Sequence, residues 1–149
     1  MTKVRPKPAD RKPPPPSVRS TWGDLGVCLI LLFLTLAVYG QARHYDFVNY
    51  DDPDHVSQNA HVRAGVSSQG LAWALTSGDS GNWFPVTRLS YLIDYQLFGL
   101  DAGMLHLTNL LFHGLSTLLV FALFRRMTGS RWRSAWVAAV FALHPLHVE

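Results

Sequence analysis

Three apolar runs separated by polar segments dominate the pattern of this chain. The stretch Leu25–Gly40 carries no charge, and extended to residues 22–42 it spans about 30 Å as a helix, the hydrocarbon thickness of a bilayer. Two further apolar runs predict helices over residues 104–124 and 132–148. We therefore expect an all-α membrane protein whose first two helices are joined by an outer loop, residues 43–103.

The first apolar run also fits a secretory signal peptide. A basic start precedes it, and Gly40, Gln41 and Ala42 form a small-x-small cleavage site after it. The long basic region and the two later runs favour an uncleaved anchor instead. Trp22 and Tyr39 stand at the two ends of this run, which are the interfacial positions that amphipathic aromatic side chains prefer.

The polar loop is predicted to carry two short helices of its own. The first covers residues 67–76, with Ser67 or Ser68 as its cap. The second begins at Pro85, runs through Phe98 and is stopped by Gly99. Its apolar side chains share one face, a pattern typical of a helix lying in the membrane surface: Val86, Leu89, Leu92, Ile93 and Leu97.

Composition supports the membrane interpretation. Hydrophobic residues make up 48% of the 149 residues and charged residues only 15%, against about 25% charged in ordinary soluble domains. The single cysteine, Cys28, excludes an internal disulfide and a zinc finger.

The distribution of charge predicts the orientation. Six of the thirteen Lys and Arg residues precede residue 20, and four more lie in residues 125–133, whereas most acidic residues fall in the loop. By the positive-inside rule both basic segments are cytoplasmic and the loop lies outside. The basic, proline-rich residues 1–21 are expected to form a disordered cytoplasmic tail. The expected location is a bacterial inner membrane, or the endoplasmic reticulum membrane in a eukaryote.

An acidic turn is the first candidate for chemistry. Asp51, Asp52 and Asp54 lie within four residues around Pro53, where proline and aspartates favour a turn that presents carboxylates. Carboxylates so close together repel one another unless a cation neutralises them. General base, metal ligand and solvated acidic turn all remain open for this cluster.

Two histidine-containing segments are further candidates. His106 and His113 share one face of the second apolar helix with Asn109, a pattern that fits hydrogen bonds between helices or a functional role for His106. His144, His147 and Glu149 follow the third run, but Pro145 interrupts the spacing that a metal-binding helix would use. We therefore assign no metal site from spacing.

Three segments in a fixed order carry a family resemblance: YDDPDHV, WFPVTRLSYLIDYQLFGLDAGMLHLTNLLFHGLSTLLV and ALHPLHVE. Over about residues 22–149 the chain resembles the N-terminal part of the GT-C membrane glycosyltransferases. It is most similar to the transmembrane and tetratricopeptide-repeat O-mannosyltransferases and their bacterial relatives. Because members of that family have many more helices, we expect this chain to be a piece of a longer protein and to be inactive alone.

The resemblance implies transfer of a sugar from a polyprenyl-phosphate-linked donor to a hydroxyl of a protein or glycan on the outer face. It maps a general base onto Asp51 or Asp52, and it leaves divalent-metal dependence open. The resemblance also implies residues that contact the sugar donor or the substrate. We place these at Arg88, the first choice for the phosphate, and at His106, His144, His147 and Glu149.

A non-enzymatic membrane protein is the rival hypothesis. A transporter or an assembly subunit would use the outer acidic loop to bind a cation or a partner. Further helices followed by 34-residue helical repeats would favour the transferase, and inverted repeats with broken helices would favour transport.

Overall fold

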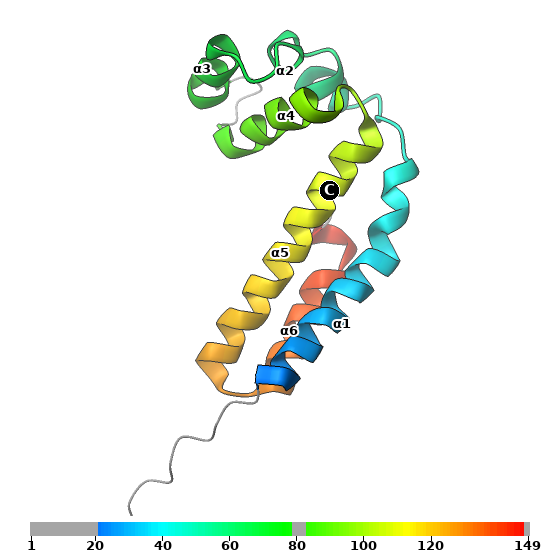
Figure 1. Ribbon diagram of the computed structural model, residues 1–149, viewed down its shortest axis with the longest axis vertical. Helices are drawn as coiled ribbons and strands as arrows, with labels where there is room; N and C mark the ends of the chain where they lie inside the picture. The colour runs from blue at the N-terminus through cyan, green and yellow to red at the C-terminus, as the bar shows by residue number, and fades with distance from the viewer. Residues whose placement is uncertain (1–20, 79–82, 148–149) are drawn as a thin grey trace, which may run out of the picture.

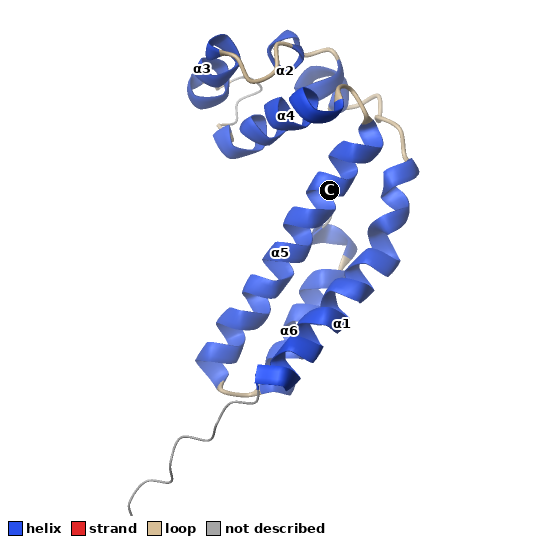
Figure 2. Cartoon of the chain, viewed as in Figure 1, coloured by secondary structure: helices blue, strands red, loops and turns tan. Residues whose placement is uncertain are grey.

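The computed structural model describes residues 21–78 and 83–147, and this part of the chain is built from helices without strands (Figures 1 and 2). Three helices form a bundle: α1 (Thr21–Tyr39), α5 (Ala102–Thr128) and α6 (Arg131–Leu143). The expected all-α class is thereby confirmed. The tail, predicted over residues 1–21, lies outside the described residues except for Thr21.

The polar loop folds into a small helical head at the N-terminal end of α5 (Figure 1). Its elements are short and follow one another closely: η1 (Gly40–His44), η2 (Pro53–Ser57), α2 (Ala60–Arg63), α3 (Ser68–Thr76) and α4 (Pro85–Phe98). Helix α4 lies across the end of α5 rather than along it (Figure 2). A last short turn, η4 (Pro145–His147), follows α6.

Small side chains allow the bundle helices to pack closely. Ser134, Ala138 and Ala142 repeat every four residues on one face of α6, and all three are buried. Gly114 of α5 approaches α1 so closely that an added Cβ atom would lie 3.2 Å from a methyl group of Leu32. Such small-residue contacts are the usual means of helix association in membranes, where apolar burial between helices gains little over lipid.

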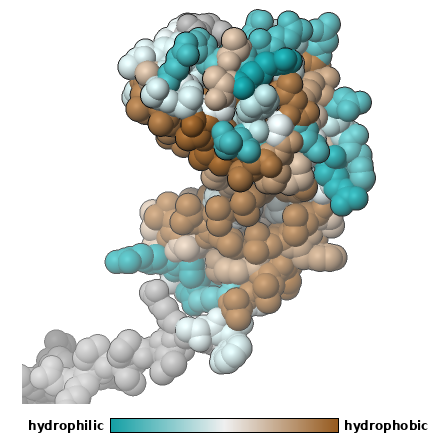
Figure 3. Space-filling model, turned by 45° about the horizontal axis from the view of Figure 1, so that its top comes forward, coloured by the Kyte–Doolittle hydropathy of each residue, from teal (hydrophilic) through white to brown (hydrophobic). Residues whose placement is uncertain are grey.

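Within residues 21–78 and 83–147, two helices are long and apolar enough to cross a membrane, Thr21–His44 and Ala102–Thr128. Their outer surfaces expose large apolar side chains, including Phe33, Leu111 and Leu119. A hydrophobic band therefore separates the polar top of the head from a smaller hydrophilic patch at the opposite end (Figure 3). Exposed apolar surface of this extent is costly in water and favourable in lipid.

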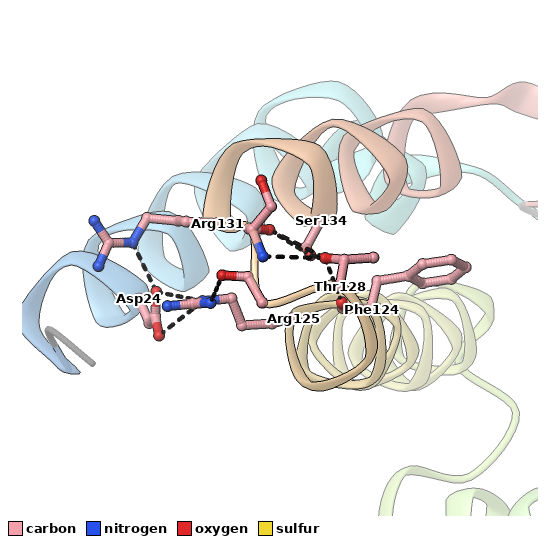
Figure 4. A network of polar contacts seen from close by, with 8 residues as sticks. Asp24, Phe124, Arg125, Thr128, Arg131 and Ser134 are labelled. Atoms are coloured by element: carbon pink, nitrogen blue, oxygen red, sulfur yellow. Dashed lines mark hydrogen bonds and ion pairs between the residues drawn. The ribbon is translucent and has the colours of Figure 1, made fainter. Parts of the chain in front are cut away.

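An ion-pair network joins all three bundle helices at the end opposite the head (Figure 4). Asp24 of α1 accepts hydrogen bonds from the Nε atoms of Arg125 at 3.1 Å and of Arg131 at 2.7 Å. Gly129 joins α5 to α6 in the left-handed conformation, with φ of +67°. The network therefore fixes the tight α5–α6 turn against the start of α1.

The head has its own apolar core, which includes Val62, Trp73, Leu92 and Leu105. Because Leu105 belongs to the second turn of α5, this core fastens the head to the bundle. The predicted helix ends are confirmed for α4, which begins at Pro85 and ends before Gly99. They are also confirmed for α3, whose Ser67 cap accepts a hydrogen bond from the amide of Gly70.

The apolar residues of α4 divide between two surfaces. Leu92 is completely buried in the head core, whereas Val86, Ile93 and Leu97 are exposed. The buried side of α4 also holds Arg88 and Asp94, two charged residues that the sequence pattern placed away from the apolar face. The reason is tertiary: α3 and α5 contact α4 on different sides, so no single face is covered.

Helix α6 ends at Leu143, short of residue 148 where the sequence pattern ended the third helix. Pro145 lacks an amide hydrogen and disfavours helical backbone in the residue before it. His113 Nε2 lies 2.9 Å from the carbonyl oxygen of Ala142, and the Tyr39 hydroxyl donates to the Leu143 carbonyl at 2.9 Å. The last carbonyls of a helix have no hydrogen-bond partner within that helix. At the end of α6, His113 of α5 and Tyr39 of α1 supply these partners.

Candidate functional site

The acidic turn lies at the start of η2, in the head. One carboxylate oxygen of Asp52 accepts a hydrogen bond of 2.6 Å from the amide of Val48, which closes the turn. Asp51 is exposed, and its backbone carbonyl accepts from the amide of His55. The two neighbouring aspartates are therefore unequal: Asp52 is held in place by the backbone, whereas Asp51 projects into solvent.

The Tyr91 hydroxyl of α4 lies within electrostatic range of Asp52 in the acidic turn and of Asp94 in its own helix. Burial raises the pKa of the Tyr91 hydroxyl, and the negative charges of Asp52 and Asp94 raise it further. Both carboxylates therefore act on the same hydroxyl group. The charge of Asp52, just before η2, therefore reaches a side chain of α4 that is far from it in the sequence.

Asp94, like Tyr91, is not among the candidate site residues that the sequence predicts. It is only 5% exposed, and its Oδ1 accepts a hydrogen bond of 2.9 Å from the Thr108 hydroxyl of α5. Burial raises the pKa of the Asp94 carboxyl, and the Thr108 hydrogen bond partly opposes that rise. A buried acid with a raised pKa is a signal of a functional site. The sequence does not reveal this signal, because the burial of Asp94 comes from contacts with other helices.

Arg88, the expected phosphate ligand, lies inside the head and is 1% exposed. Its guanidinium carbon is 4.8 Å from the ring centroids of both Trp73 and Phe84, and Nη1 donates to the carbonyl of Ser77. A guanidinium held between two aromatic rings is a cation–π arrangement. Contact with a phosphate requires the side chain to leave this position.

His106 lies near the N-terminal end of α5, on the side of the head. Its Nε2 atom is buried and has no hydrogen-bond partner within the described part of the chain. Buried polar atoms are nearly always paired, so an atom of this kind indicates a place where water or a ligand group binds. The role of His106 in binding the donor stays a prediction.

The structure does not bring His144 to the acidic turn. His113 of α5 contacts the Ala142 carbonyl, so the end of α6 lies beside His113. Helix α5 begins at the head with Ala102, eleven residues before His113. With a rise of about 1.5 Å per residue, eleven residues place the end of α6 about 16 Å along α5 from the head. His147 is described only as the last residue of η4, and Glu149 lies outside the described residues.

In residues 21–78 and 83–147, no group of three or more His, Cys, Asp or Glu side chains is arranged to hold a metal ion. Asp51, Asp52 and Asp54 therefore do not converge on one point, although they are adjacent in the sequence.

Comparison with curated proteins identifies the relatives of this chain. Protein O-mannosyl-transferase Tmtc2 of Drosophila melanogaster is 34% identical over 130 residues, which cover 82% of the chain. The chain is a relative of the protein O-mannosyl-transferases. Tmtc1 of the same fly is 31% identical over 78% of the chain, and mouse TMTC1 is 26% identical over 83%.

The similarity covers most of this chain but little of its relatives. The matched residues span 14% of the length of each of these three O-mannosyl-transferases. No protein-family model and no solved structure matches the chain. The relationship therefore rests on similarity to curated sequences.

Proposed function

We propose that this chain forms part of a membrane mannosyltransferase that moves mannose from a polyprenyl-phosphate-linked donor to hydroxyl groups of proteins. The observation that carries the proposal is the 34% identity, over 82% of the chain, with a protein named O-mannosyl-transferase. The apolar bundle supports a membrane location and therefore a lipid-linked donor. Because the chain spans 14% of that relative, the activity belongs to the whole protein.

The acidic turn supplies the general base in this proposal. An acceptor hydroxyl forms a bond to the anomeric carbon as the bond from that carbon to the phosphate oxygen breaks, and the hydroxyl proton passes to a carboxylate. One oxygen of Asp52 is held by the Val48 amide, which leaves the other oxygen free to accept a proton. Asp51 is the alternative base, because it is exposed to an incoming acceptor.

The donor binds beside α5 in this proposal. His106 supports this position, since its unpaired Nε2 atom can contact a sugar hydroxyl or a phosphate oxygen. The exposed apolar residues Val86, Ile93 and Leu97 of α4 support a head that rests on the membrane surface, where a lipid-linked sugar is presented.

The orientation follows the positive-inside rule. The head and its acidic turn lie outside, and the α5–α6 turn with Arg125, Arg126, Arg131 and Arg133 lies in the cytoplasm. Acceptors are therefore proteins that have already crossed the membrane.

The test measures the transfer of mannose from radiolabelled polyprenyl-phosphate mannose to peptides. The assay uses membranes that contain the full-length protein. Asp52→Asn and Asp51→Asn keep the size and most hydrogen bonds of each side chain but remove proton acceptance. Loss of the general base lowers the rate by about 10²–10⁴-fold. Asp46→Asn, at an exposed position of the same loop, is the matched control.

The outcomes separate the candidate functions. A large loss of rate in one Asn variant at unchanged protein level identifies the base. Full activity in both variants removes the acidic turn from the mechanism. Absence of mannose transfer in the parent, together with a cation requirement for binding a partner, supports the non-enzymatic membrane protein.

A further inference from the structure

The end of the bundle opposite the head carries a groove that is lined by both charged and apolar side chains. It lies between α1 and α5 and has a volume of about 380 Å³. Its lining combines apolar side chains with charged ones: Asp24, Cys28, Phe121, Ala122, Arg125 and Arg126. Apolar residues alone line the groove between α1 and α6 near Trp132 and Trp136.

The charge of this groove is positive despite the presence of Asp24. Asp24 is already bound by Arg125 and Arg131, so its carboxylate is neutralised inside the bundle (Figure 4). Arg126 is exposed and forms no hydrogen bond or ion pair with another residue of the described chain. One free guanidinium therefore stands at the mouth of the groove, where it can bind an anion bidentately.

Aromatic side chains mark the level of the membrane surface at this end. Trp22 of α1 and Trp132 and Trp136 of α6 are all largely exposed. Exposed tryptophans concentrate where the headgroups meet the hydrocarbon. Arg126 is therefore at headgroup level, whereas Cys28, one turn further along α1 from Asp24, and Phe121 lie at the level of the acyl chains.

We propose that the α1–α5 groove binds an anionic phospholipid, with the phosphate on Arg126 and an acyl chain along Cys28, Phe121 and Ala122. Positive charge at the mouth fits the phosphate, and the apolar interior fits a hydrocarbon chain. Basic pockets between membrane helices on the cytoplasmic side are known to take anionic headgroups. This site is independent of the proposed mannosyl transfer, since it lies at the other end of the bundle from the acidic turn.

The test is native mass spectrometry of the full chain taken from mixed vesicles of phosphatidylcholine and phosphatidylglycerol. The parent should retain phosphatidylglycerol over phosphatidylcholine. Arg126→Gln should weaken this preference about fivefold, the effect expected for one arginine at a membrane surface. Arg43→Gln, which removes the same charge from an exposed arginine near the head, should leave it unchanged.

A second pair of variants tests the acyl-chain part of the groove. Ala122→Trp fills the groove without a change of charge and should abolish retention of phosphatidylglycerol. Leu123→Trp places the same indole on the neighbouring exposed residue, which does not line the groove, and should retain the lipid. Equal loss in both tryptophan variants, or in both Arg→Gln variants, would overturn the proposal.

Two further arms distinguish other sources of anion binding. Replacement of the six Lys and Arg residues that precede residue 20 by Gln tests the basic tail. Loss of phosphatidylglycerol in that variant, with retention in Arg126→Gln, assigns the binding to the tail and refutes the groove. Displacement of the lipid by inorganic phosphate alone refutes the acyl-chain contact.

Discussion

The hydroxyl of Tyr39 in α1 donates a hydrogen bond of 2.9 Å to the carbonyl of Leu143, the last residue of α6. This contact pairs a carbonyl at the end of α6 that has no hydrogen-bond donor left within its own helix. The adjacent Ala142 carbonyl is paired with His113 of α5 in the same way. Three helices therefore meet at one point, where the regular structure of α6 stops.

Tyr39→Phe should lower the stability of the bundle. The variant keeps the ring but leaves the partly buried Leu143 carbonyl without its donor, and loss of such a hydrogen bond costs about 0.5–1.5 kcal/mol. Thermal unfolding in detergent measures the change. Tyr45→Phe removes a hydroxyl from an exposed tyrosine and should leave the unfolding temperature unchanged. Equal behaviour of the two variants would contradict this role for Tyr39.

Gly103→Ala should disrupt the junction between the head and the bundle. A Cβ atom at position 103 would lie 2.2 Å from the carbonyl oxygen of Arg43, and neither backbone can shift easily. We expect a loss of about 1–3 kcal/mol or more in the free energy of unfolding, as for overpacking in a core. Gly26→Ala is the control, since a Cβ atom there meets nothing within 4 Å. Because alanine favours helix, that control should gain about 0.5–1 kcal/mol.

The stability of the head should fall as pH rises through the titration of Asp94. Burial raises the pKa of this carboxyl in the folded state, so the folded protein binds the proton more tightly than the unfolded chain does. Stability is therefore highest below the unfolded pKa, about 4, and declines up to the raised folded pKa. Asp94→Asn should remove this decline, as measured by unfolding at several pH values.

Thr108→Val provides an independent check on the same carboxyl. The Thr108 hydrogen bond lowers the pKa of Asp94, so its removal should move the end of the stability decline to higher pH. An unchanged pH profile in this variant would show that another group controls the titration.

Arg88→Met should destabilise the head rather than weaken donor binding alone. The guanidinium lies over Trp73 and Phe84 and is fully buried, so its loss removes a desolvated cation–π contact of about 2 kcal/mol or more. The measurement compares the unfolding temperature with the KM for the lipid-linked donor. A raised KM at unchanged stability would instead support direct contact with phosphate. Arg43→Met is the exposed control.

Cysteine labelling checks the orientation. In a Cys28→Ser background, a cysteine at position 57 in the head should react with an impermeant reagent from outside. A cysteine at position 128, beside the α5–α6 turn, should react only after permeabilisation. The reverse pattern would place the acidic turn in the cytoplasm and remove it from a transfer reaction outside.

Local structure and the family resemblance followed from the order of residues alone. Apolar runs of membrane length predicted α1 and α5, and Pro85 and Gly99 predicted the two ends of α4, because caps and helix breakers act on their nearest neighbours. The order of short motifs pointed to the O-mannosyltransferases, which the 34% identity supports. The positions of the basic residues predicted an orientation, which stays a prediction.

Which polar side chains are buried, and which of them contact one another, depended on how the helices pack together. Helical periodicity placed Arg88 away from the apolar face of α4, but Trp73 and Phe84 enclose it from other segments. The pairing of Asp94 with Thr108 joins two helices whose crossing no local pattern specifies. Periodicity fixes the side of a helix on which a residue lies, whereas burial depends on the elements that cover that side.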